Sequence, residues 1–156
     1  MQVVECPNVP VESASLAPYT SLVFLAGGIT GCPDWQREMI DRFRDLPDVV
    51  LLNPRRSNFN IDDPVQSEQQ IEWESLWLNE SYITLFWFPY QTMCPITLFE
   101  LGVAAARGDR IVVGVHPGYA RRFDVIKQME LLRPDITVYD NFADVVEETL
   151  SMLITW

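Results

Sequence analysis

Glu100 is a single carboxylate within residues 95–107, a stretch that the sequence predicts to be an otherwise almost wholly apolar helix. A rotation of about 100° per residue places Ile96, Val103 and Ala104 around it. Burying an ionised carboxylate without a partner is costly, so such a residue is usually paired, protonated or part of a functional site. Glu100 is therefore a candidate catalytic residue, and the alternative is a structural glutamate whose tip reaches water or Arg107.

Glu74 is a second acid that is expected to face inward. It lies on a predicted helix that begins with a capping box formed by Ser67 and Gln70. On a helical wheel Glu74 falls within the same arc as Trp73 and Trp77. Two inward carboxylates suit the cleavage of glycosidic bonds, in which one acid attacks or stabilises the anomeric carbon and the other handles the leaving group.

Strands and helices are predicted to alternate five times along the chain, and these elements must position the two acids. The predicted strands are residues 21–26, 48–53, 82–88, 110–115 and 136–139; the predicted helices are 34–46, a helix from 67 onward, 95–107, 123–132 and 142–154. This alternation predicts an α/β fold: a flavodoxin-like or Rossmann-like, doubly wound, parallel five-stranded sheet in the order 2-1-3-4-5, with helices on both faces. Residues 1–20 are predicted to be an irregular lead-in, and residues 21–156 a single domain.

Two loops are expected to meet where the order of such a sheet reverses, which is where ligands bind in this class of fold. They are residues 27–33, after the first predicted strand, and residues 89–95, before the helix of Glu100. The amides of Gly27 and Gly28 could hold a phosphate or sugar oxygen. The glycines match neither a dinucleotide fingerprint nor a P-loop, so a tight turn is an equally good interpretation.

Composition and charge narrow the function classes. The 156 residues include 22 acidic and 11 basic side chains, a formal net charge of −11 that disfavours nucleic acid polymers and anionic membrane surfaces as partners. The longest strongly apolar run, residues 82–88, is too short to span a bilayer, and the first 20 residues do not resemble a signal peptide. Three cysteines without metal-type spacing indicate reduced thiols, a cytoplasmic protein and no metal site.

Several stretches resemble the nucleoside 2-deoxyribosyltransferase-like family over about residues 21–140. They are FLAGGITG at residues 24–31, WESL at 73–76, FWFPYQTMCPITLFELG at 86–102 and VGVHPGYARRFDV at 113–125. The resemblance implies the fold expected above, with Glu100 as the nucleophile. It also implies that Glu74 matches an acid that shapes the sugar or base end of the pocket.

The activity implied by the resemblance is attack of the Glu100 carboxylate on C1′ of a nucleoside sugar, with a glycosyl-enzyme intermediate. A second base would resolve this intermediate in a transferase, and water in an N-glycoside hydrolase. The expected partner is a small nucleoside or nucleotide, no cofactor is implied, and related enzymes are often homo-oligomers. The candidate substrate-binding residues are Phe24, Gly27, Gly28, Ile29, Trp87, Tyr90 and Cys94.

Two departures from the family pattern leave alternatives open. No acid lies in residues 89–99, just ahead of Glu100, so the proton donor to the leaving base is not identified. The first glycine loop has no basic residue, which favours a free nucleoside over a nucleotide. The alternative functions are cleavage of NAD or ADP-ribose-type molecules and non-catalytic nucleotide sensing. A Cys94 nucleophile with His116 is a further alternative, although His116 also suits a turn-capping role.

Overall fold

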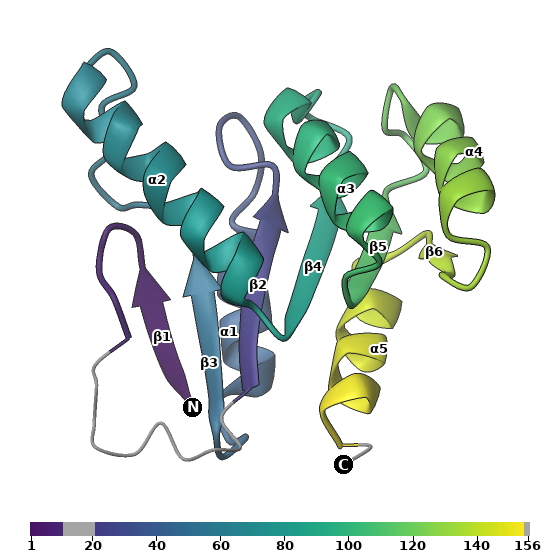
Figure 1. The fold of residues 1–156 in the computed structure, drawn as a ribbon, viewed down its shortest axis with the longest axis horizontal. Helices are drawn as coiled ribbons and strands as arrows, with labels where there is room; N and C mark the ends of the chain where they lie inside the picture. Colours follow the sequence, from purple (N-terminus) through teal and green to yellow (C-terminus); the bar gives the residue numbers. More distant parts are fainter. Residues whose placement is uncertain (11–20, 155–156) are drawn as a thin grey trace. The chain divides into compact units, whose positions relative to one another are not determined.

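Strands and helices alternate along the chain as predicted, in a computed structural model that describes residues 1–10 and 21–154. The fold is α/β with a parallel sheet, and its strands lie in the order β1-β3-β2-β4-β5-β6 (Figure 1). The chain divides into two units, residues 1–25 with 35–82 and residues 26–34 with 83–156. Each unit is described below by itself.

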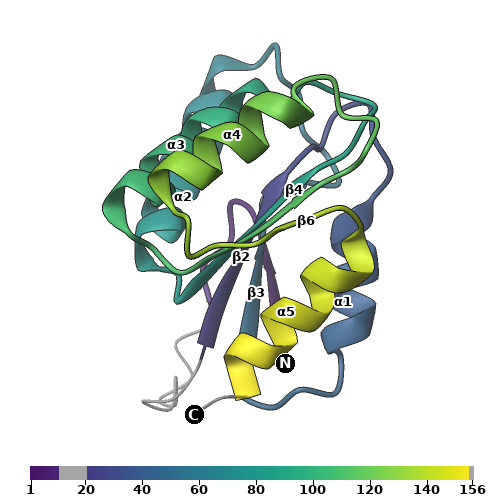
Figure 2. The same cartoon turned by 90° about the vertical axis from the view of Figure 1, so that its right-hand side faces the viewer.

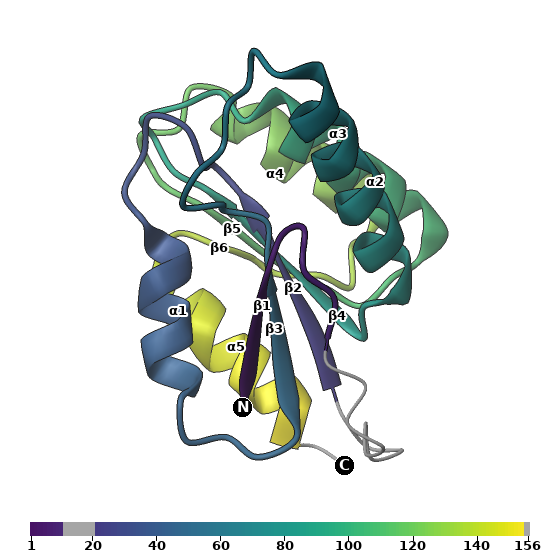
Figure 3. The same cartoon turned by 90° about the vertical axis from the view of Figure 1, so that its left-hand side faces the viewer.

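The first unit is built around a central strand that is buried along its whole length. This strand, β3 (Val49–Asn53), pairs in parallel with β1 (Gln2–Glu5) and with β2 (Ser21–Gly27). The helices α1 (Trp35–Phe43) and α2 (Pro64–Glu80) lie on opposite sides of these strands (Figure 3). The side chains of β2 and β3 are almost continuously apolar, as expected for strands that are covered on both faces.

The second unit repeats this arrangement around β5 (Ile111–Val115), which pairs in parallel with β4 (Ile83–Phe88) and β6 (Val138–Tyr139). The helices α3 (Pro95–Arg107) and α4 (Arg122–Leu132) lie on one side of these strands, and α5 (Phe142–Ile154) lies on the other (Figure 2). The predicted bounds of α3 are confirmed. Pro95 provides a first helical residue without a free N–H, and Gly108 adopts the left-handed conformation that ends the helix.

The prediction of five strands was wrong, because the sheet has a sixth strand, β1. The five expected strands keep the predicted order, and β1 lies beyond β3. Residues 2–5 contain no long apolar run, and only Val4 of this strand is buried. Its structure depends on pairing with β3, from Gln2 opposite Val50 to Glu5 opposite Asn53, which is a long-range interaction. Residues 11–20, the rest of the expected lead-in, lie outside the described residues.

The predicted capping box at Ser67 was also wrong. Helix α2 begins three residues earlier, at Pro64, and its N-cap is Asp63. The Asp63 carboxylate accepts hydrogen bonds from the backbone N–H groups of Val65, at 3.0 Å, and Gln66, at 3.5 Å. An aspartate followed by proline satisfies the first amides of a helix better than a serine one turn further on, so the cap moves to Asp63.

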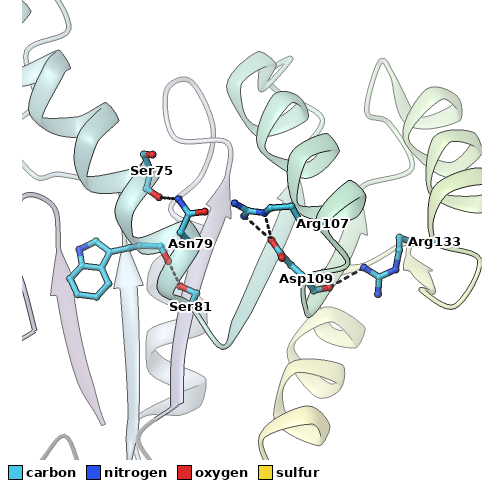
Figure 4. Close-up of polar contacts among 7 residues, drawn as sticks. Ser75, Asn79, Ser81, Arg107, Asp109 and Arg133 are labelled. Carbon is cyan, nitrogen blue, oxygen red and sulfur yellow. Dashed lines mark hydrogen bonds and ion pairs between the residues drawn. The ribbon is translucent and has the colours of Figure 1, made fainter.

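Side chains also satisfy carbonyl groups near the end of α2 (Figure 4). Asn79 Nδ2 donates to the carbonyl oxygen of Ser75 at 2.6 Å, and Ser81 Oγ donates to that of Trp77 at 2.5 Å. The last four carbonyls of a helix, here including that of Trp77, have no partner within the helix itself, so the bond from Ser81 lets α2 end without a glycine. The connection to β4 follows directly.

Candidate functional site

Gly28 is where the two loops predicted to meet come together within the second unit. A Cβ atom on Gly28 would lie 2.7 Å from Cγ of Pro89, 2.9 Å from Cγ2 of Thr92 and 3.1 Å from Sγ of Cys32. No side chain fits at such distances, so the contact between the two loops requires glycine here. The structure therefore gives Gly28 a packing role, whereas the sequence analysis had weighed a ligand contact against a tight turn.

The segment that follows β5 in the same unit forms hydrogen bonds with the loop before α3. Tyr119 is buried, and its hydroxyl donates to the carbonyl oxygen of Met93 at 2.7 Å. The backbone N–H of His116 donates to the carbonyl oxygen of Phe88 at 3.0 Å. Burial raises the pKa of Tyr119 to about 12, so its hydroxyl stays protonated and continues to donate at neutral pH. The loop before α3 is thus held at both ends by the segment that follows β5.

Cys94 is the N-cap of α3, and it adopts the left-handed conformation with φ 45°. This conformation costs a non-glycine residue roughly 1–2 kcal/mol, and such strain collects at functional sites. The side chain is buried, and burial raises the pKa of the thiol to about 12, with a smaller contribution from Cys32. Cys94 is therefore a protonated thiol at neutral pH, which argues against the alternative of a cysteine nucleophile.

His116 caps a turn, as one interpretation of the sequence expected. Its Nδ1 accepts a hydrogen bond from the backbone N–H of Gly118 at 3.0 Å, so the neutral ring carries its proton on Nε2. The ring also packs against Tyr90, with 4.7 Å between the ring centroids. Tyr90 itself is 55% exposed. The pair therefore presents an aromatic surface beside the loop that leads to α3.

Glu100 is half-buried on α3, at the border between two stripes of the helix. The buried stripe contains Thr97, Leu101 and Ala104, whereas Ile96 is 63% and Val103 is 38% exposed. The expectation that Ile96 and Val103 enclose Glu100 in the core was therefore wrong, because the buried stripe is centred one residue further round. Glu100 thus lies between the buried and the exposed faces of α3.

Arg107, which the sequence analysis considered as a partner for Glu100, binds Asp109 at the end of α3 (Figure 4). Its Nη2 and Nε lie 2.7 and 3.0 Å from Oδ2 of Asp109. The backbone carbonyl oxygen of Asp109 accepts a further bond from Nη1 of Arg133 at 3.0 Å. These contacts tie α3 to the segment that follows α4.

Glu74 lies in the first unit, on α2, and is half-buried. Its Oε1 accepts a hydrogen bond from Nε2 of Gln70 at 2.8 Å, and the same nitrogen donates to the carbonyl oxygen of Pro54 at 2.8 Å. Burial raises the pKa of Glu74, and the bond from Gln70 opposes that rise. The sequence analysis treated Gln70 only as part of a capping box, although its spacing of four residues from Glu74 on a helix is a signal for this contact.

Two of the candidate substrate-binding residues lie in the core. Phe24 is 1% exposed and packs against the ring of Trp73, with 5.8 Å between centroids. Trp87 is 6% exposed and packs edge-on against Phe142 at 5.4 Å. Gly27, at the end of β2, and Ile29, in the loop that follows, are half-buried. The structure thus places Tyr90, rather than Trp87, where an aromatic ring is open to a ligand.

Among residues 1–10 and 21–154, no three His, Cys, Asp or Glu side chains are grouped as metal ligands would be. None of the helices in the described part of the chain combines the length and the apolar character that crossing a bilayer requires.

Comparison with known proteins adds one finding to this geometry. Residues 20–119 match the model of the family described as nucleoside 2-deoxyribosyltransferase like. A search of curated proteins found no match. The matched segment runs from the start of β2 to Tyr119, so it includes Glu74, Glu100 and both loops that meet at Gly28. Because the match covers well over half of the sequence, the chain belongs to the nucleoside 2-deoxyribosyltransferase-like family.

Proposed function

We propose that this protein cleaves or exchanges the N-glycosidic bond of nucleosides, with Glu100 as the nucleophile. The observation that carries the proposal is the position of Glu100. It is half-buried on α3, the helix that follows the loop packed on Gly28, and it lies within the segment that matches the family. Membership of the family supports nucleoside glycosyl transfer in general. The identity of the nucleophile and the covalent intermediate are the finer part of the proposal.

In the first step a carboxylate oxygen of Glu100 bonds to C1′ as the bond from C1′ to the base nitrogen breaks. The transition state resembles an oxocarbenium ion, and the product is a glycosyl ester of Glu100. The leaving base takes up one proton. In the second step a nitrogen of an acceptor base, or water, attacks C1′, and Glu100 is released as a carboxylate. The attacking group gives up one proton, which restores the acid that protonated the leaving base. A base as acceptor makes the protein a transferase, and water makes it a hydrolase.

Glu74 is the proposed source of the proton. Its pKa is raised by burial, which keeps a larger protonated fraction near neutral pH than an exposed carboxyl would have. Tyr90, exposed and packed on His116, is proposed to stack on the base.

The test is mass spectrometry of the protein and of the small molecules after incubation with ribonucleosides, deoxynucleosides, their monophosphates and NAD, with and without free adenine as acceptor. A released base together with a sugar adduct on the peptide of Glu100 is the expected result. Glu100→Gln should lower turnover at least about a thousand-fold without unfolding the protein. The matched control is Glu147→Gln, at an exposed position on α5, and should leave turnover unchanged.

Other outcomes separate the alternatives. Release of nicotinamide from NAD alone would identify an NAD or ADP-ribose-type glycohydrolase. Binding of nucleosides without any product would contradict the enzymatic proposal and favour a sensing domain. Turnover that survives in Glu100→Gln would rule out Glu100 as the nucleophile.

A further inference from the structure

The side-chain amide of Gln70 joins Glu74 to the end of β3. Its Nε2 donates one hydrogen bond to the carbonyl oxygen of Pro54 and one to Oε1 of Glu74, both at 2.8 Å. A backbone carbonyl can only accept, so the nitrogen of the amide, and not its oxygen, must face Pro54. The contact with Pro54 therefore ensures that Glu74 meets the nitrogen of the amide and not its oxygen.

Both N–H bonds of Gln70 are used in this bridge, while its Oε1 is buried and has no hydrogen-bond partner in the described part of the chain. A buried acceptor without a donor costs free energy. A side chain that served packing alone would avoid that cost by being apolar. The presence of an amide here indicates that its two donor groups are the useful part of the residue.

We propose that Gln70 is a positioning residue, which holds Oε1 of Glu74 as a hydrogen-bond acceptor and thereby assigns the transferable proton to Oε2. This inference rests on the proposed function, because it concerns the carboxyl group that is proposed to protonate the leaving base. An oxygen that receives an N–H bond acts as the carbonyl-type oxygen of a neutral carboxyl, so the hydroxyl is on the other oxygen. Anchoring through Pro54 then keeps Oε2 in one orientation.

The charged surroundings of Glu74 in the first unit agree with this role. Cys6, which follows β1, senses the charges of Glu74, Arg56 and Glu5, and burial raises its pKa to about 11, so it is a neutral thiol near pH 7. The other acids of α2, Glu68, Glu72 and Glu80, are exposed. Burial favours the protonated form of Glu74, and the hydrogen bond from Gln70 favours the ionised form.

The test compares Gln70→Met, which keeps the length of the side chain without the amide, with the matched control Gln69→Met at the exposed neighbouring position. The side-chain carboxyl of Glu74 is followed by ¹³C NMR across a pH titration, after assignment with Glu74→Gln. We expect the midpoint for Glu74 to shift upward in Gln70→Met and to stay at the wild-type value in Gln69→Met. An unmoved midpoint in a folded Gln70→Met would overturn the proposal.

Gln70→Asn is the second variant, because its amide is one methylene shorter and cannot span both acceptors. It should also shift the midpoint upward, and it provides the test if Gln70→Met does not fold. In turnover assays, Gln70→Met should shift the part of the pH–rate profile that reports Glu74 to higher pH. It should also lower kcat/KM about fivefold, the size expected for one hydrogen bond.

A double-mutant cycle adds a readout that a merely structural role would not move. If Gln70 acts through Glu74, the loss of kcat/KM caused by Gln70→Met should disappear in the Glu74→Gln background. An equal loss in both backgrounds would overturn the proposal. The NMR titration needs no turnover, so an inactive wild-type protein would contradict the proposed function, whereas an unmoved midpoint would contradict the role of Gln70.

Discussion

Gly28 and Pro89 approach each other so closely that a Cβ atom on Gly28 would lie 2.7 Å from Cγ of Pro89. The proline ring cannot rotate away, and Thr92 blocks the same space at 2.9 Å. Gly28→Ala should therefore separate the two loops and lower the free energy of unfolding by about 1–3 kcal/mol, as overpacking does elsewhere. Urea denaturation measures this change.

The matched control for this prediction is Gly102→Ala on α3, where a new Cβ atom would meet nothing within 4 Å. In the interior of a helix, alanine should be more stable than glycine by about 0.5–1 kcal/mol. The two substitutions should thus have opposite signs. Equal effects would show that the close contact at Gly28 does not determine stability.

The start of α2 gives a second prediction. Asp63→Ala removes the acceptor of the Val65 and Gln66 amides, so it should lower the midpoint of thermal unfolding by several degrees. Ser67→Ala should change the midpoint much less, because Ser67 lies inside the helix. Differential scanning calorimetry of the two variants compares the observed cap with the one that the sequence suggested, and a larger loss in Ser67→Ala would favour the latter.

Glu74 should reduce stability progressively as the pH rises. Its folded-state pKa is raised by burial above the ordinary value of 4.5, so the folded protein holds this proton more tightly than the unfolded chain. The resulting stabilisation is complete below pH 4.5 and is lost as the pH rises through the folded-state pKa. Glu74→Gln does not titrate, so its free energy of unfolding relative to wild type should increase from pH 4.5 to pH 7.

Chemical denaturation at a series of pH values tests this dependence, with Glu72→Gln as the control. Glu72 is exposed on the same helix, so its variant removes an acidic side chain from α2 without altering a buried carboxyl. A constant difference for Glu74→Gln would mean that burial does not perturb this carboxyl.

The raised pKa values of the two buried thiols predict that the protein becomes less stable at alkaline pH. Burial raises the pKa of Cys6 from 9.0 to about 11 and that of Cys94 from 9.0 to about 12. Above pH 9 the unfolded chain loses thiol protons that the folded protein retains, so the free energy of unfolding should fall with rising pH. In Cys94→Ala the free energy of unfolding should fall less steeply between pH 8.5 and 10.5 than in the wild type. An unchanged slope in urea titrations would contradict the raised pKa of Cys94.

The sequence predicted most of the regular structure because its signals are local. Pro95 and Gly108 mark both ends of α3, and apolar runs mark the strands that are buried on both faces. It missed β1, whose structure depends on pairing with a strand more than 40 residues away. Asp63 was missed because two capping signals lie within one turn of each other, and only the structure shows which one the helix uses.

The candidate site was predicted less completely, because its geometry depends on contacts between distant segments. The bond from Tyr119 to Met93 spans 26 residues and has no local pattern. Phe24 and Trp87, which lie in buried strands, were named as candidate substrate-binding residues. An apolar residue in such a place can point either into the core or towards a ligand, and both point into the core. The sequence analysis interpreted Gln70 as part of a capping box with Ser67, and therefore missed its contact with Glu74.

Tyr90 gives the last prediction, which concerns substrate binding. Its ring is held by His116 and remains 55% exposed, so a stacked base would gain contact area without reorganising the site. Tyr90→Ala should raise KM for a nucleoside about tenfold, within the range of roughly 1–3 kcal/mol for the loss of one base-stacking aromatic residue, while Tyr90→Phe should retain most of the affinity. The control Phe123→Ala removes an aromatic ring that is 78% exposed on α4, and it should leave KM unchanged. If the two alanine variants behave alike, the base is bound elsewhere, and the packing of Tyr90 on His116 serves only to hold the loop before α3.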